Sequence, residues 1–198
     1  MKIHDISQEV FSCAVYPGDP APQKQTLADM QSGALYNLTA FSMCAHNGTH
    51  IDAPRHFIAD GKSVGELSLS AFVGLAYVAE REGKISADGA KAILYDAKSA
   101  RSGAEKRVLI KGSAVVTEAA AEVFAAAGTL LVGVEGQTVG PENAPMGVHK
   151  ILLGAGTALL EGARLGEVKD GACFLSAAPL MLAGADGAPC RAYVIELE

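Results

Sequence analysis

The sequence has 198 residues, of which 49% are hydrophobic and 19% charged, and this composition excludes a mainly disordered chain. Lysine and arginine total 16 against 22 for aspartate and glutamate, and without a concentrated basic stretch we expect no nucleic-acid partner. The N-terminus lacks the apolar run of a secretory signal, no window is long enough to span a membrane, and the four cysteines form no CxxC pair. We therefore expect a cytoplasmic chain with reduced thiols and no membrane partner.

The first third is rich in proline and glycine, which predicts loops, and loops on a rigid scaffold often carry chemistry. Between these loops the segment 37–46 alternates as a strand does and would deliver His46 at its end.

The pattern changes after residue 70, where apolar strands alternate with helical segments. Ser86 or Asp88 caps the first expected helix, and Thr117 starts the second, which Gly128 ends. The expected elements are strands at 74–82, 107–112, 129–136, 157–161 and 191–197, and helices at 86–100 and 117–128.

Strand, helix and strand in that order form a βαβ unit, in which two parallel strands share one covering helix. The fold class is therefore α/β. Because no internal repeat or long linker divides the chain, we expect residues 1–198 to form one domain.

Chemistry-bearing side chains concentrate in HNGTHIDAPRHF at 46–57, which holds three of the five histidines. His46, His50, Asp52 and His56 have the same parity, so in an extended segment they would face one side. Gly48, two β-branched residues and a proline argue against a helix here. We therefore expect an extended segment that aims these side chains at one point.

His46, His50 and Asp52 supply two imidazoles and a carboxylate, the donor set of a catalytic transition-metal site. Asp52 has a second oxygen that could bridge to another ion. His149 and Glu161 would complete such a second site, although no physical rule fixes their spacing, and His56 remains free for proton transfer.

For three further residues the sequence predicts a role less specifically. Cys44 shares the parity of the cluster and is either a soft metal ligand or an inert strand thiol. Glu135 follows an apolar strand and either lines the site or caps the next loop. His4 is expected to have an ordinary structural role.

The segment HNGTHIDAPRHF resembles the motif HxGTHxDxPxHF of the cyclase family of metal-dependent hydrolases, whose best-known members are bacterial kynurenine formamidases (arylformamidases). The resemblance continues through DIS at 5–7, VYPGDP at 15–20, DGKSVGEL at 60–67, LLVGVEG at 130–136 and HKILLGAGTALLEG at 149–162, and so covers most of the chain.

The resemblance implies a swivelling β/β/α-type domain with a small barrel-like mixed sheet covered by helices, in a homodimer or higher homo-oligomer whose partner helps to wall the site. It implies two divalent ions, zinc as in the formamidases or manganese as in relatives such as isatin hydrolases. His46, His50 and Asp52 match the ligands of the first ion. Asp52, His149 and Glu161 match those of the second. His56 matches the proton-transfer residue.

The chain departs from the formamidase pattern in two segments. Tyr16 stands where a tryptophan commonly precedes PGD and is expected to pack on the substrate ring, while Glu135 and Thr138 stand where Asp and Ser are usual. These differences concern the substrate and not the metal. They leave N-formylkynurenine as one candidate substrate among aryl formamides, isatin-like cyclic amides and other small acyl compounds.

The predicted activity is hydrolysis of such an amide by a metal-bound hydroxide. The alternatives are a metal-dependent cyclase or dehydratase, a lactone hydrolase on the same scaffold, and a metal-binding or ligand-binding module without turnover. The presence of His56 favours catalysis over the last of these.

Overall fold

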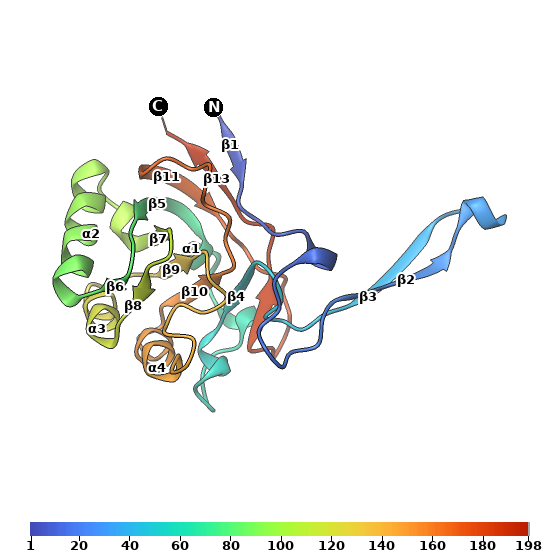
Figure 1. Ribbon diagram of the computed structural model, residues 1–198, viewed down its shortest axis with the longest axis horizontal. Helices are drawn as coiled ribbons and strands as arrows, with labels where there is room; N and C mark the ends of the chain where they lie inside the picture. The colour runs from blue at the N-terminus through green and yellow to red at the C-terminus, as the bar shows by residue number, and fades with distance from the viewer. Residues whose placement is uncertain (198) are drawn as a thin grey trace.

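The computed structural model describes residues 1–197, whose centre is a curled mixed sheet of nine strands in the order β1-β13-β11-β5-β7-β9-β10-β4-β12 (Figure 1). These strands are β1 (Ile3–Asp5), β4 (His50–Asp52), β5 (Val73–Glu80), β7 (Arg107–Lys111), β9 (Leu131–Val134), β10 (Ala158–Glu161), β11 (Gly171–Ser176), β12 (Gly187–Pro189) and β13 (Tyr193–Glu196). The helices are α1 (Leu69–Phe72), α2 (Ala87–Ala100), α3 (Glu118–Ala126) and α4 (Met146–Gly154), and the short strands β6 (Lys84–Ile85) and β8 (Val115–Val116) pair separately.

The middle of the sheet is parallel, because β5, β7, β9 and β10 pair in that order with the same direction. Helices α2 and α3 connect the first three of these strands, so the predicted α/β class and βαβ unit are confirmed. Ser86 caps α2 by accepting the amide of Gly89, and Thr117 caps α3 by accepting that of Ala120. Gly128 lies beyond α3 with φ +65°, a conformation that ends a helix.

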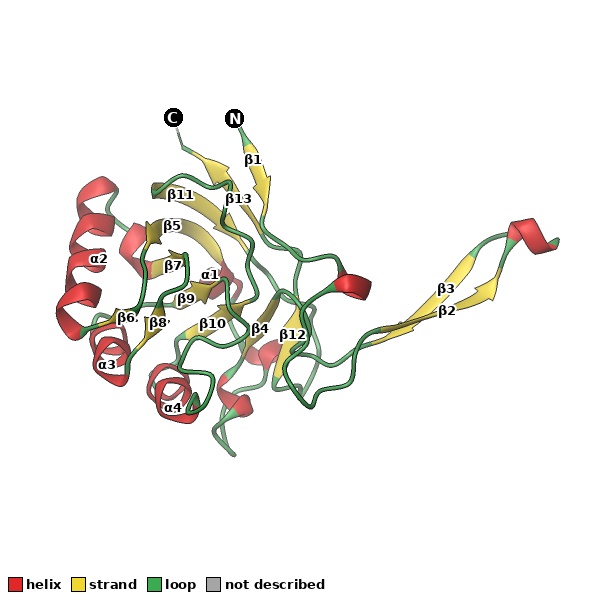
Figure 2. Cartoon of the chain, viewed as in Figure 1, coloured by secondary structure: helices red, strands yellow, loops and turns green. Residues whose placement is uncertain are grey.

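The curled sheet separates two apolar cores. The helices α2, α3 and α4 cover its outer face (Figure 2). On this face Ile93, Phe124 and Leu152 pack with strand residues such as Ile110. The inner face encloses a second cluster. Burial on both faces explains why β7 and β9 read as continuous apolar runs and not as alternating strands.

Antiparallel strands flank the parallel centre and complete the curl. On one side β11 pairs with β5 and β13, and β13 with β1, so the predicted strand at 191–197 is present as β13. On the other side β10 pairs with β4 and β4 with β12. Strands β11 and β12 and helix α4 are among the elements that were not predicted, and β12 consists of only three residues, Gly187–Pro189.

A hairpin formed by β2 (Gln23–Ala28) and β3 (Leu38–Ser42) projects from the rest of the molecule (Figure 1). The strand expected at 37–46 is therefore shorter than predicted and ends at Ser42. His46 lies in the turn that follows, because Gly48 takes φ +63° and redirects the chain into β4.

Among residues 1–197, no helix is both long and apolar enough to cross a membrane.

Candidate metal centre and active site

Strand β4 presents His50 and Asp52 on one face and Ile51 on the other, as the alternation of an extended segment requires. Ile51 is fully buried in the inner core, which fixes the face that the two polar side chains take. His50 and Asp52 are each 1% exposed, and His50 Nε2 lies 3.3 Å from Asp52 Oδ1.

His46 and His56 reach the same point by other routes, so the expectation of an extended segment over 46–57 is wrong outside β4. His46 lies in a turn, and Pro54 begins a single 3₁₀ turn that ends with His56. The rings nevertheless converge, because the centroid of His46 lies 5.1 Å from that of His50 and 4.0 Å from that of His56.

The structure brings His149 and Glu161 to the same place. Glu161 is the last residue of β10 and the direct partner of His50 in the antiparallel pairing with β4. His149 comes from the middle of α4, and its Nε2 lies 3.2 Å from Glu161 Oε1 and 3.6 Å from Asp52 Oδ2. Asp52 thus lies between two pairs of side chains, His46 with His50 and His149 with Glu161. The members of each predicted donor set therefore lie together.

In His50 and His149, the ring nitrogen Nδ1 has a backbone carbonyl as its hydrogen-bond acceptor. His50 Nδ1 donates to the carbonyl of Gly48 at 3.0 Å, and His149 Nδ1 donates to that of Pro145 at 2.8 Å. Each ring therefore turns Nε2 toward the carboxylates. Partners of this kind fix the tautomer of metal-binding histidines.

The electrostatics join these groups into one unit. Burial alone would raise the pKa of Asp52, but the close imidazoles of His149, His46 and His50 hold it well below its usual range. Burial lowers the imidazole pKa of His50, but the hydrogen bonds to Asp52 and Glu161 outweigh it and raise that pKa to about 10. His56 differs, because burial lowers its pKa with a smaller opposing effect of the Asp52 charge.

The donor groups fit a divalent metal ion. The sets His46, His50, Asp52 and Asp52, His149, Glu161 each place their ligand atoms within 4.8 Å of one another. Asp52 Oδ2 is buried and accepts no hydrogen bond, which is costly for a carboxylate oxygen unless a cation satisfies it. Imidazole nitrogen with carboxylate oxygen is the donor chemistry of zinc and related ions.

The site opens into a cavity of ≈ 350 Å³, a volume suited to a small organic ligand. The predicted Tyr16 lines it, and the Tyr16 hydroxyl donates to the carbonyl of Glu142 at 3.3 Å. Gln137 and Thr138 also line it, and their amide and hydroxyl groups are buried without a hydrogen-bond partner in the described chain. Both follow β9 at the carboxyl edge of the parallel strands, a usual place for ligand contacts that could have indicated them.

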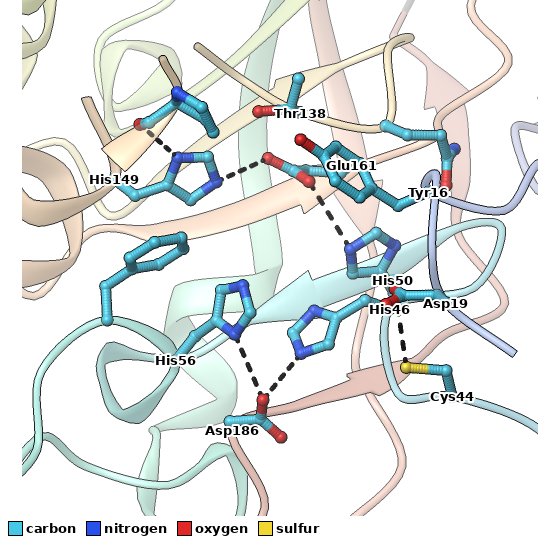
Figure 3. A pocket seen from close by; sticks show the side chains of 13 residues that line it. Tyr16, Asp19, Cys44, His46, His50, His56, Thr138, His149, Glu161 and Asp186 are labelled. Carbon is cyan, nitrogen blue, oxygen red and sulfur yellow. Dashed lines mark hydrogen bonds and ion pairs between the residues drawn. The ribbon is translucent and has the colours of Figure 1, made fainter. Parts of the chain in front are cut away.

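Asp186 is a site residue that the sequence analysis did not identify. Its Oδ2 lies 2.9 Å from His46 Nε2 and 3.2 Å from His56 Nδ1 (Figure 3). It lies in the alanine- and glycine-rich stretch 183–188, where no spacing or periodicity separates it from an ordinary turn residue.

Glu135, Cys44 and His4, whose roles were predicted less specifically, lie in three different environments. Glu135 clamps two loops by accepting the amides of Gly112 and Leu165, at 2.7 and 2.8 Å, and does not line this cavity. Cys44 lines the cavity with its Sγ 3.8 Å from Asp19 Oδ2, outside both donor sets. His4 pairs with Glu196 at 2.8 Å, a structural contact on the far strands β1 and β13.

Comparison with known proteins agrees with this arrangement. Residues 4–141 match the family model Cyclase, described as "Putative cyclase". A protein named kynurenine formamidase from Delftia acidovorans is 32% identical over 206 residues, which cover 98% of this chain and 97% of the relative. A kynurenine formamidase from Sphingopyxis alaskensis is 31% identical and covers 99% of both chains.

A solved structure named "Potential Metal-Dependent Hydrolase With Cyclase Activity" has the same architecture. It is 26% identical and superposes with a TM-score of 0.82 over 100% of this chain and 98% of that one. The likeness confirms the predicted fold, a curled mixed sheet with covering helices.

Proposed function

The chain belongs to the cyclase family, and on that premise we propose that it is a metal-dependent hydrolase that cleaves the C–N bond of a small aryl formamide. The position of Asp52 carries this proposal, because its buried carboxylate belongs to both donor sets, and the other members of those sets line a cavity of ligand size. The relatives named kynurenine formamidase favour an N-formylkynurenine-like substrate.

The chain would hold two divalent ions, with zinc favoured over manganese. His46, His50 and Asp52 would bind one ion, and Asp52, His149 and Glu161 would bind the other. Such ions lower the pKa of water toward neutrality and polarise a carbonyl group. The chain itself supplies the orientation. The carbonyls of Gly48 and Pro145 hold the rings of His50 and His149, and the amide of Val139 donates to Glu161 Oε1 at 2.7 Å.

His56 is the proposed proton-transfer residue. It is the one imidazole of the group whose pKa is lowered, so it is neutral near pH 7 and able to accept a proton. Its ring stacks on His46 at the edge of the cavity, and its Nδ1 is directed to Asp186. The other ring nitrogen, Nε2, points away from Asp186 (Figure 3). From there it can take a proton from the attacking water and return it to the departing nitrogen.

The substrate would lie between the metal-binding residues and the outer cavity wall. Tyr16 and Phe57 supply aromatic surface for an aryl ring. The unpartnered groups of Gln137 and Thr138 supply polar contacts, since a substrate that satisfied them would remove a desolvation cost of about 1–3 kcal/mol per group.

We also propose that the chain, taken as one domain over 1–198, forms a homodimer through the β2–β3 hairpin. The hairpin exposes large apolar side chains that the rest of the chain does not cover, among them Leu27, Met30, Leu38 and Phe41. A projecting apolar arm of this kind is typical of an interface. The cytoplasm remains the predicted compartment, and the four cysteines, all free thiols, are consistent with it.

A hydrolysis screen tests the activity. Zinc-loaded or manganese-loaded protein is incubated with N-formylkynurenine, formanilide, isatin and an aryl lactone, and the products are analysed by mass spectrometry. We expect the formamides to lose their formyl group with net addition of water. If none of the amides were turned over, the proposal would be contradicted. A product formed without net addition of water would also contradict it and would favour a cyclase or dehydratase.

A further inference from the structure

A third cluster of ligand-type side chains lies beside the two proposed metal-binding sets. It consists of His46, His56 and Asp186, whose donor atoms also lie within 4.8 Å of one another. One carboxylate oxygen, Asp186 Oδ2, serves both rings, and the rings stack with their planes 29° apart (Figure 3). Asp186 has no role in the activity proposed above.

The backbone holds Asp186 firmly in this place. It lies immediately before β12, whose Gly187 is the direct partner of Asp52 in β4. The Asp186 carbonyl accepts the amide of Ala53 at 2.9 Å. A Cβ at Gly187 would lie 2.7 Å from His46 Cε1 and 2.8 Å from a backbone oxygen, so the ring of His46 packs directly on this strand.

The cluster differs from the two proposed metal sites in its hydrogen bonding. Those sites share Asp52, whose Oδ2 is buried without a hydrogen-bond partner. Here both imidazole nitrogens already have a partner in Asp186 Oδ2, and the carboxylate side chain is 47% exposed. The groups therefore satisfy one another and do not need a cation.

The arrangement determines which nitrogen of His56 carries the hydrogen. A carboxylate can only accept, so the neutral ring must place its hydrogen on Nδ1, which leaves the lone pair on Nε2. In Figure 3 this nitrogen points away from Asp186 toward the space between His46 and His149. A ring with the opposite tautomer would have no lone pair there to accept a proton.

We propose that Asp186 is a positioning residue that acts through His56, and this inference rests on the hydrolytic function proposed above. Asp186 holds the ring with Nδ1–H toward itself and Nε2 toward the substrate. When the water O–H bond breaks, its proton passes to Nε2 while the oxygen bonds to the formyl carbon. When the C–N bond breaks, the same proton passes from Nε2 to the nitrogen, and Asp186 stays ionised throughout.

Kinetics of Asp186 variants measured at saturating metal test this role. We expect Asp186→Ala to lower kcat by about 10–100-fold with KM changed less than about twofold, a smaller loss than the about 10²–10⁴-fold that a general acid or base itself contributes. Asp186→Asn keeps one acceptor oxygen and should recover part of the loss. Asp88→Asn, a change at an exposed carboxylate of α2, is the matched control and should behave as the unmodified protein.

A double-mutant cycle separates positioning of His56 from other effects. If Asp186 acts through His56, the double variant His56→Ala with Asp186→Ala should have the same kcat as His56→Ala alone. If the loss of kcat in the double variant equalled the product of the losses in the two single variants, the proposal would be overturned. An Asp186→Ala protein that regained full kcat once metal was saturating would also overturn it, because Asp186 would then act through His46 as a proposed ligand.

Nitrogen-15 NMR of the histidine rings gives a readout independent of turnover. We expect the His56 signal, assigned by its loss in His56→Ala, to show the Nδ1–H tautomer in the zinc-loaded protein and a tautomer mixture in Asp186→Ala. An unchanged tautomer would overturn the positioning role. Absence of hydrolysis in the unmodified protein would instead count against the proposed function, and the NMR comparison would still decide the role of Asp186.

Discussion

His50 and Glu161 are direct partners in the antiparallel pairing of β4 with β10, and His50 Nε2 lies 3.6 Å from Glu161 Oε2. Residues directly opposite in such a pair project to the same face of the sheet. The pairing therefore joins the two proposed metal sets through the backbone, although His50 and Glu161 lie far apart in the sequence. A shift of one residue in register would turn Glu161 away from the site.

The shared position of Asp52 predicts how metal content responds to substitution. Asp52→Ala removes a ligand from both proposed sets, so we expect less than one tightly bound ion per chain. His149→Ala removes a ligand from one set only and should leave about one ion. Elemental analysis of dialysed protein measures both, with Asp88→Ala as the control. Two ions retained by Asp52→Ala would contradict the bridging position.

Metal uptake should release protons. Burial lowers the imidazole pKa of His149, but the close carboxylates of Asp52 and Glu161 raise it to about 10, the same as for His50. Both values lie above the ordinary 6.5, so near pH 7.5 the metal-free rings hold protons that a cation must displace. We expect about two protons released per chain and an affinity that falls as pH is lowered.

Isothermal titration of EDTA-treated protein with zinc in buffers of different ionisation enthalpy counts these protons. His149→Ala should release about one fewer. A heat of binding that did not depend on the buffer would show that the rings are already neutral and would contradict the prediction.

Proton transfer by His56 predicts a loss of turnover without a loss of metal. His56→Ala should lower kcat by about 10²–10⁴-fold, the usual contribution of a general acid or base, while elemental analysis finds the same metal content. His4→Asn is a matched control, because His4 pairs with Glu196 far from the cavity. It should keep kcat even if the melting temperature falls. Full turnover in His56→Ala would refute the assignment.

The proposed dimer predicts that a charge on the hairpin lowers the mass in solution. Phe41 is 56% exposed on β3, and Phe41→Glu would place a carboxylate within the proposed apolar interface. We expect light scattering to report two chains for the unmodified protein and one for the variant. Leu69→Glu changes an apolar side chain of similar exposure on α1 and should leave the mass unchanged. A single-chain mass for the unmodified protein would remove the proposal.

The sequence was most informative where one local rule controls the structure. Caps and apolar runs placed α2, α3 and the parallel strands correctly, because Ser86 and Thr117 act on their own helix termini. Alternation placed His50 and Asp52 on one face, because Ile51 between them enters the core. The residue types within 46–57 identified the cluster itself.

Long-range contacts explain what the sequence analysis missed or placed wrongly. His46 and His56 enter the site from turns, which parity cannot describe. Asp186 lies 140 positions from His46 and meets it only because β12 adds to the edge of β4. That pairing depends on the closure of the whole sheet.

The backbone after Glu161 supplies a last prediction, which concerns stability. Gly162 has φ +69°, and a Cβ built there would clash with the carbonyl oxygen of Gly48, the same carbonyl that holds the ring of His50. Gly162→Ala therefore adds both left-handed strain and a clash with backbone, and should lower the free energy of unfolding by more than the about 1–2 kcal/mol of the strain alone. Gly156→Ala is the matched control, because Gly156 has φ +81° with nothing within 4 Å of the added carbon.

Urea denaturation of the two metal-free variants separates the strain from the clash. We expect Gly156→Ala to lose only the cost of its backbone conformation and Gly162→Ala to lose clearly more. Gly162→Ala should also weaken metal binding, since the Gly48 carbonyl cannot move away without releasing His50 Nδ1. Equal losses of stability and unchanged metal affinity would show that the loop at Gly48 yields freely and that the close contact does not hold the site.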